Sequence, residues 1–369
     1  LNISGASEQT SYYMSLGYSQ QEGFLKGNTF DRLTTRINLD HKLTKFLKIG
    51  TNFSYTNTAN AGPNSGIAGG GFSIAGLGRL PLVLAPIVSP YVNAQGQGSQ
   101  TLDPGFDYNI SANNTIGFMG NSIALAFYNP NFILENNTFR SINNHAIGNV
   151  YADFEIIDGL NFKTLYGIDN LAIENRSFLD ARHGDGFGAN GSAFNSYDKL
   201  QRWNFQNTLN YLKLIGDHDF GVLLGTEQQY TNRESWGATR TQISDRFFTT
   251  YQGNFTVINP AGNLLTENFL TSMFTRLNYS YARKYYATFN LRRDGYSAFA
   301  PGNKYGNFYG GSVGYTISEE EFWKKSLGNT INYFKLKGSY GIVGNSGVND
   351  FASLSLFGSG LYGTNPTLF

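Results

Sequence analysis

Alternation of apolar and polar residues recurs along most of the chain, and it limits the fold more than any other feature. From 32 to 40, Leu, Thr and Ile hold the odd positions, whereas Arg, Thr, Asn and Asp hold the even ones. Similar runs begin near 11, 48, 149, 160, 202, 219, 272, 285, 308 and 333. A period of two places successive side chains on opposite faces of a strand. With a short strand near 2–5, the pattern predicts about twelve strands.

Composition narrows this all-β class. Charged residues make up 14% of the chain, against roughly 25% in an ordinary soluble domain. The formal net charge of +1 gives no electrostatic case for nucleic acid binding. The absence of cysteine excludes a disulfide framework, a zinc–thiolate site and a cysteine nucleophile.

The membrane signal is dispersed rather than continuous. The longest fully apolar run, 80–88, includes two prolines and is far shorter than the roughly 18 residues of a spanning helix. In a transmembrane β-barrel only every second residue faces lipid. The opposite face here is mostly Ser, Asn, Gly, Thr and Tyr with sparse charges, as expected of a hydrated lumen. Aromatic residues near strand ends predict girdles at the two membrane interfaces; they are Tyr18, Tyr55, Tyr211, Tyr281 and Tyr285.

Connection lengths favour an antiparallel up-and-down barrel. Tight connections are expected at 6–9, 41–45, 158–159, 216–217 and 283–284. Longer ones are expected between them at 20–30, 60–140, 176–200, 230–268 and 295–306. Outer-membrane barrels alternate short periplasmic turns with long extracellular loops in this way.

Two connections depart from the simple rule. The predicted extracellular loop 60–140 is long enough to hold one or two short helices, and loops of this length are usually functional or disordered. The predicted periplasmic turn 318–332 is longer than expected, and SEEEFWKKSL within it can form one short helix. We expect residues 1–369 to form a single partial barrel.

Several long motifs resemble the SusC/RagA-type TonB-dependent transporters of Bacteroidetes outer membranes. They are TSYYMSLGYSQQEGFLKG, RINLDHKLTKFLKIGTNFSYT, LRRDGYSAFAPGNKYGNFYGGSVGYTISEEEFW and FKLKGSYGIVGNSG. The resemblance implies a 22-stranded barrel with an N-terminal plug, a TonB box, a SusD-like surface lipoprotein as a lid, and import driven through TonB. This chain shows no plug, no TonB box and about half the strands. NPTLF at its end reads as a loop because of Pro366, so we expect an interior piece of such a barrel.

No residue is expected to be catalytic, and neither a metal nor a cofactor is predicted. His183 lies in DARHGDG with Asp180 and Asp185, a candidate metal set for which a solvated loop is the favoured interpretation. His145 is a second histidine near carboxylates. Asp103 and Asp107 in DPGFDYN could bind calcium, but the EF-hand spacing is missing.

Exposed aromatic residues with amide and carboxylate neighbours suit sugar binding. Five such residues fall in the predicted long loops: Tyr108, Phe118, Phe127, Tyr128 and Trp236. The alternative is that these residues pack the loops together or contact the lid lipoprotein. The substrate-binding residues therefore stay unassigned.

These features predict active import of an oligosaccharide or a peptide across the outer membrane. The expected partners are a SusD-like lipoprotein, the TonB complex, the glycan or peptide substrate and outer-membrane lipid. A passive porin or an adhesion barrel without energy coupling is the alternative. A secreted carbohydrate-binding protein or hydrolase is a third class, but no carboxylate pair stands in a recognisable setting.

YYATFNLRRD, at 285–294, predicts the depth of one strand in the membrane. Alternation places Arg292 toward the lumen and Arg293 toward lipid. Eight residues from Tyr285 rise about 20 Å at ~3.3 Å per residue and a ~40° tilt, close to the outer edge of the apolar band. We expect Arg293 to extend to the outer-leaflet headgroups, where lipid phosphates are available.

Overall fold

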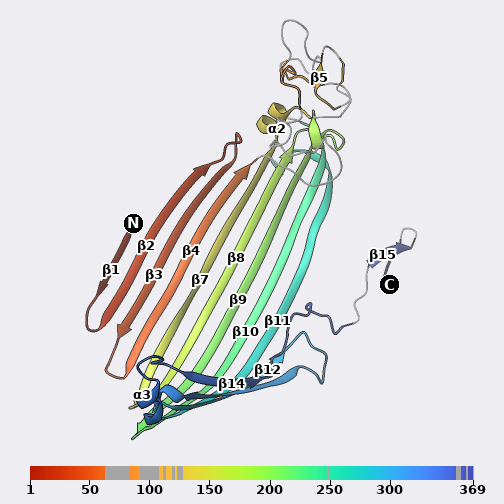
Figure 1. The fold of residues 1–369 in the computed structure, drawn as a ribbon. Helices are drawn as coiled ribbons and strands as arrows, with labels where there is room; N and C mark the ends of the chain where they lie inside the picture. Colours follow the sequence, from red (N-terminus) through yellow and green to blue (C-terminus); the bar gives the residue numbers. More distant parts are fainter. Residues whose placement is uncertain are drawn as a thin grey trace.

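The computed structural model describes residues 1–62, 84–91, 108–110, 114–118, 121–122, 128–245, 247, 249–354, 359–362 and 365–368. The strands of its main sheet are β1 (Asn2–Ala6), β2 (Thr10–Glu22), β3 (Thr29–Lys42), β4 (Leu47–Gly62), β7 (Thr138–Ile157), β8 (Leu160–Leu179), β9 (Ser192–Ile215), β10 (His218–Ile243), β11 (Phe255–Tyr281), β12 (Tyr285–Tyr296), β13 (Tyr305–Thr316) and β14 (Lys335–Gly341). These twelve strands pair in chain order, and every pairing is antiparallel. The predicted antiparallel up-and-down order of about twelve strands is confirmed, and Figure 1 shows the long strands lying side by side.

Smaller elements lie outside this sheet. The loop between β4 and β7 includes the hairpin of β5 (Gly117–Phe118) and β6 (Asn121–Ser122), and the helix α2 (Pro130–Asn136). η2 (Gly184–Gly186) follows β8, whereas η3 (Ile317–Glu319) and α3 (Glu321–Ser326) lie between β13 and β14. No helix in the described ranges is long and apolar enough to cross a membrane.

The chain's last residues differ from expectation. We read NPTLF as a loop, but the structure has a two-stranded hairpin of β15 (Ser359–Tyr362) and β16 (Asn365–Leu368). Pro366 pairs with Leu361 within it. In a two-stranded hairpin each strand has one unpaired side, so a proline without an N–H can be accommodated there.

The two ends of the sheet differ in their connections. At one end, here the turn end, the strands are joined by the short segments 7–9, 43–46, 158–159, 216–217 and 282–284, as predicted. Gly159 and Gly216 have φ of 80° and 58°, the left-handed conformation that two-residue hairpin turns require. The turn end also has one long connection, 317–334, which contains η3 and α3 and coincides with the long turn predicted at 318–332. The other strands are joined at the opposite end, the loop end, by 23–28, 63–137, 180–191, 244–254 and 297–304.

Three strands extend far past their predicted ends. β9, β10 and β11 contain 24, 26 and 27 residues, so the connections expected at 176–200 and 230–268 shorten to 180–191 and 244–254. Our boundaries followed the alternation of hydrophobicity. Above the apolar zone both faces contact polar surroundings, so alternation fades while the backbone ladder continues.

One face of the sheet is apolar and is bordered by two rows of aromatic rings. The turn-end aromatic row comprises Phe220, Tyr279, Tyr281, Tyr285 and Tyr315, with neighbouring ring centroids 4.9–6.3 Å apart. The loop-end aromatic row comprises Tyr166, Trp203, Tyr230 and Phe269, with spacings of 6.1–6.3 Å. Two of the predicted girdle residues, Tyr281 and Tyr285, stand in the first row.

The distance between the rows matches a membrane. Tyr279 and Phe269 lie in the two rows, ten positions apart on β11. At ~3.3 Å per residue and a ~40° tilt, this separation rises about 25 Å. That height equals the apolar band of an outer-membrane barrel.

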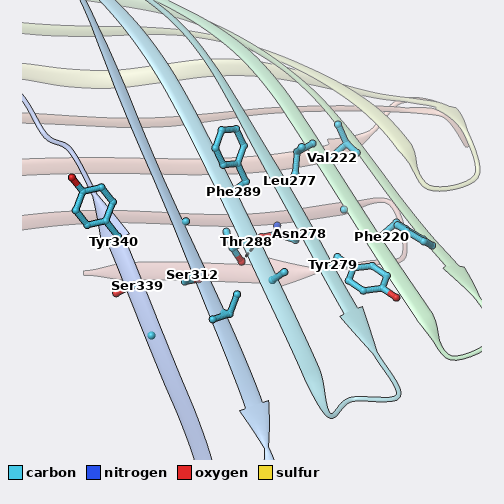
Figure 2. Close-up of a pocket in the computed structure, with 15 residues that line it drawn as sticks. Phe220, Val222, Leu277, Asn278, Tyr279, Thr288, Phe289, Ser312, Ser339 and Tyr340 are labelled. Atoms are coloured by element: carbon cyan, nitrogen blue, oxygen red, sulfur yellow. Dashed lines mark hydrogen bonds between the residues drawn. The ribbon is translucent and has the colours of Figure 1, made fainter.

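Figure 2 shows the apolar face where β10–β14 run side by side, with the N-terminal strands behind them. A shallow groove of about 720 Å³ runs over this surface, and Val222, Leu277, Phe289, Val313 and Tyr340 are among the residues that line it. Figure 1 shows that the sheet is curled, with β12 and β14 crossing in front of the long strands.

Candidate functional site

The polar face of the sheet holds three charged networks, the first near the turn end. Lys48 Nζ lies 3.2 Å from Asp40 Oδ2, and the Tyr151 hydroxyl donates to the same carboxylate. Lys163 Nζ lies 4.3 Å from the centre of the Tyr151 ring. Four neighbouring strands, β3, β4, β7 and β8, supply these side chains because alternation turns each of them to the same face.

The second network crosses β7–β10 further toward the loop end. His145 Nε2 is 2.7 Å from Asp169 Oδ1, and Arg202 Nη1 is 3.7 Å from Asp169 Oδ2. Arg202 Nε donates to Thr231 Oγ1 over 3.3 Å. His145, noted above as a histidine near carboxylates, is therefore part of a carboxylate–guanidinium network on the polar face.

Arg292 is the centre of the third network. Its Nε donates to Asp294 Oδ1 over 2.6 Å, and its Nη2 donates to Glu227 Oε2 over 2.9 Å and to Ser272 Oγ over 2.7 Å. Ser272 is almost fully buried. The predicted orientation of Arg292 toward the polar face, with Asp294 as a partner, is confirmed.

A segment following β14 folds over this third network. Asn268 Nδ2 donates to Asp350 Oδ1 over 3.0 Å, and the Ile342 N–H donates to the Tyr309 carbonyl over 2.8 Å. A cavity of about 400 Å³ lies between segment and sheet; Arg292, Asp294, Tyr296, Phe308 and Asn345 are among its lining residues. A polar solute passing along this face would meet hydrogen-bond donors and acceptors here, together with charges of both signs.

At the loop end, a compact cluster holds two of the predicted aromatic residues. Tyr108 is 8% exposed and belongs to a buried group with Phe132, against which Tyr128 packs. The Tyr108 hydroxyl donates to Glu135, and burial raises the pKa of Tyr108 to about 12. These contacts correspond to the alternative we gave for Tyr108 and Tyr128, that they pack the loops together.

His183 is fully buried in the same cluster. Its Nε2 accepts the Asn129 backbone N–H over 2.7 Å, and its ring lies edge-on to Phe132 at 5.3 Å. Burial lowers the pKa of His183 to about 3, so the ring is neutral. Asn129 is also the N-cap of α2, since its side chain accepts from the Asn131 and Phe132 N–H groups.

The favoured reading of DARHGDG as a solvated loop is wrong for its first half. Asp180 is 4% exposed, and its two carboxylate oxygens accept from Arg182 at 2.9 and 2.7 Å. The segment is buried because Phe132 and Asn136 of α2 contact His183 and Arg182 and Asn114 hydrogen-bonds to the Gly184 backbone. These are long-range contacts that local composition does not reveal. No group of three His, Cys, Asp or Glu that could hold a metal occurs among the residues the structure describes.

The remaining candidates fall in different places. Trp236 lies in β10 and not in a loop; its ring is 4.7 Å from Tyr197 on β9 and is 47% exposed. Phe118 is in β5. Phe127, Asp103 and Asp107 lie outside the described residues.

No protein-family model matches the chain. Individual relatives do match. The chain is 30% identical to TonB-dependent receptor P3 of Formosa agariphila over 361 residues, which is 97% of this chain and 34% of that protein. It is 28% identical to TonB-dependent receptor SusC of Bacteroides thetaiotaomicron over 373 residues, which is 97% of this chain and 34% of that protein.

Solved structures agree on the fold. The RagAB peptide transporter superposes on all of this chain with a TM-score of 0.72 at 21% sequence identity, and the match covers 39% of the transporter chain. The RagAB peptide importer in its closed-closed state gives a TM-score of 0.75 at 22% identity, again over all of this chain and 39% of the importer chain.

The chain spans about a third of the length of the curated relatives it matches. It has the fold of the same stretch of the RagAB transporter. Over its whole length the chain is therefore a relative of the SusC/RagA-type TonB-dependent receptors, and it has the fold of one part of their outer-membrane β-barrel.

Proposed function

We propose that this chain is part of an active importer that brings a nutrient oligomer across the outer membrane. The observation that carries the proposal is the two-faced sheet, apolar between two aromatic rows on one side and lined by three charged networks on the other. A barrel closed from such strands has a polar lumen through an apolar band. The full barrel is proposed to have 22 strands around a plug, as the resemblance to the family implies.

The polar face supports a substrate rich in hydrogen-bonding groups. Asp169, Arg202, Glu227 and Arg292 offer carboxylates and guanidinium groups at one surface, and each can bind either amide or hydroxyl groups. Of the similar proteins, RagAB is described as a peptide transporter. We propose an oligosaccharide or a peptide as cargo, and a passage without covalent chemistry.

The proposed partners are a SusD-like surface lipoprotein and the TonB complex. The loop-end cluster around Phe132 and His183 supports the first, because a packed extracellular loop offers a defined surface to a lid. The TonB complex would act through parts of the protein that this chain does not include.

Energy dependence tests the proposal against a passive porin or adhesion barrel. The host strain with and without the intact gene is supplied with fluorescent peptides and, separately, with fluorescent oligosaccharides. Periplasmic accumulation is then measured before and after a proton uncoupler. Gene-dependent uptake of one class that stops with the uncoupler is expected. Uptake that continues unchanged, or no gene-dependent uptake of either class, contradicts it.

A further inference from the structure

Arg293 is an isolated charge on the apolar face. Between the two aromatic rows, β10–β13 point Val, Leu, Thr, Gln, Met, Ala, Phe, Asn, Gly and Tyr side chains outward, and Arg293 is the charged exception among these described positions. Its guanidinium carbon lies 5.0 Å from the centre of the Tyr305 ring. In the described part of the chain it makes no ion pair, whereas the adjacent Arg292 makes two.

A groove of about 590 Å³ leads away from Arg293 along the apolar face. Two rows of paired residues line it. The row nearer the loop end pairs Asn207, Thr226, Met273, Arg293 and Asn307 across five strands. The row two residues nearer the turn end pairs Phe162, Leu209, Leu224, Thr275 and Leu291.

The groove therefore has a polar edge and an apolar edge, and the two edges face opposite ends of the sheet. The edge that carries a cation and two amides faces the loop end, and the edge of Phe and Leu faces the turn end. Lipid molecules in the outer leaflet have the same order, with a headgroup toward the loop end and acyl chains below it. Arg293 pairs with Met273, four positions nearer the turn end than Phe269 of the loop-end aromatic row. That is about 10 Å below the row at ~3.3 Å per residue and a ~40° tilt, and a long arginine side chain can extend over much of this distance toward the headgroups.

We propose that this groove binds one phosphate-bearing lipid of the outer leaflet, with its phosphate on Arg293 and one acyl chain against Leu224 and Leu291. Guanidinium donates two parallel hydrogen bonds to phosphate oxygens, and the ring of Tyr305 holds it in place from one side. On the loop-end side of the apolar band, where the dielectric constant is lower than in water, a cation–phosphate pair is stronger than in water. Asn207 and Asn307 supply further donors at the same edge.

The test uses the intact protein purified in detergent, examined by native mass spectrometry with dioleoyl phosphatidic acid. Wild type is expected to retain one lipid, and Arg293→Gln to retain at least tenfold less at equal lipid concentration. Arg293→Lys keeps the charge and should recover part of the binding. The heat-induced mobility shift in SDS gels confirms that each variant remains a folded barrel.

Two further arms separate the sources of phosphate and the contribution of the groove. Thr275→Trp fills the apolar row without touching Arg293 and should also reduce retention. Inorganic phosphate at millimolar concentration should not displace the lipid, and dioleoylglycerol, which lacks phosphate, should not be retained. Equal retention by wild type and folded Arg293→Gln overturns the proposal, as does displacement of the lipid by inorganic phosphate.

Discussion

Arg292 and Arg293 are neighbours in the chain and differ in everything that surrounds them. Arg292 donates to Asp294, Glu227 and Ser272 on the polar face. Arg293 lies on the apolar face, where its guanidinium carbon is 5.0 Å from the centre of the Tyr305 ring. Successive Cβ atoms of a strand point to opposite faces. Two adjacent residues can therefore lie in different environments, one on the polar face and one on the apolar face.

The same contrast separates the two faces of the whole sheet. The polar face gathers ions into networks shared by three or four strands, whereas the apolar face gathers rings into two rows about 25 Å apart. Charges on the first face are tolerated because partners and water are available. The charge on the second, Arg293, lies between the two rows, and its long side chain can extend toward polar groups at the loop end.

The largest effect is expected from a charge placed in the middle of the apolar face. Leu291→Arg lies opposite Thr275, near the midpoint between the two aromatic rows, and should lower the free energy of unfolding by about 2–4 kcal/mol in lipid vesicles. Thr288→Arg, three residues away on the polar face, should change it by less than about 1 kcal/mol. Urea titration of the folded fraction on unboiled SDS gels measures both. Equal losses in the two variants would refute the assignment of faces.

The next effect concerns the loss of the central cation of the third network. Arg292→Ala leaves the carboxylates of Glu227 and Asp294 facing each other without a cation. We expect a loss of about 1–3 kcal/mol, reduced from the value for a fully buried group since Arg292 is 38% exposed. Arg293→Ala is the matched control and should change stability by less than about 0.5 kcal/mol in lipid-free detergent. The same urea titration ranks the pair.

A smaller effect should follow removal of one ring from the loop-end aromatic row. Trp203 contacts Tyr166, Tyr230 and Phe269, so Trp203→Ala should cost about 1–2 kcal/mol. Gln206→Ala, on the polar face of the same strand, is the comparison and should be near neutral. If the membrane interface lies elsewhere, fluorescence quenching by brominated lipids will fail to place Trp203 near the headgroups.

The smallest effect at neutral pH is expected at His183, which belongs to neither face. Burial lowers its pKa to about 3, below the ordinary value of about 6.5. The unfolded loop therefore binds a proton that the folded loop does not, and stability falls as pH drops from about 6.5 toward 3, by up to ~1.4 kcal/mol per pH unit. Hydrogen exchange of the α2 amides should accelerate over that range.

His183→Gln is the informative variant for this cluster. Its amide oxygen can accept the Asn129 N–H as the imidazole does, but it does not titrate. Exchange in α2 should therefore lose most of its acid dependence while remaining slow at pH 7.5. Unchanged acid dependence in the variant would show that another group controls the loop.

Local pattern predicted the topology well and the strand ends poorly. Gly159 and Gly216 indicate tight turns, and the alternation around Phe289 indicates the two faces of β12. Both signals were readable because a tight turn and a strand face depend on only a few neighbouring residues. The upper parts of β10 and β11 were missed since their two faces are similarly polar there. Trp236 was assigned to a loop for that reason, although it pairs with Tyr197 on β9 and with Asn263 on β11, next to a register shift between Trp236 and Gly237.

The candidate site shows the same division. Arg292 could be assigned to the polar face and given Asp294 as a partner, because the two are separated by one residue on one strand. Glu227 is 65 positions away in sequence, and nothing in the local pattern identifies it. His183 looked solvated because its neighbours are Gly, Asp and Arg, whereas its burial comes from contacts with Tyr128, Asn129 and Phe132.

The amino-acid sequence alone determined which side chains share a face, which connections are tight and which family the chain resembles, because all three are written in short repeating patterns. The tertiary structure alone decided the ion networks across strands, the spacing of the aromatic rows, the burial of His183 and the groove beside Arg293. Each of these depends on the register between strands, and register places residues far apart in sequence within a few ångströms of one another.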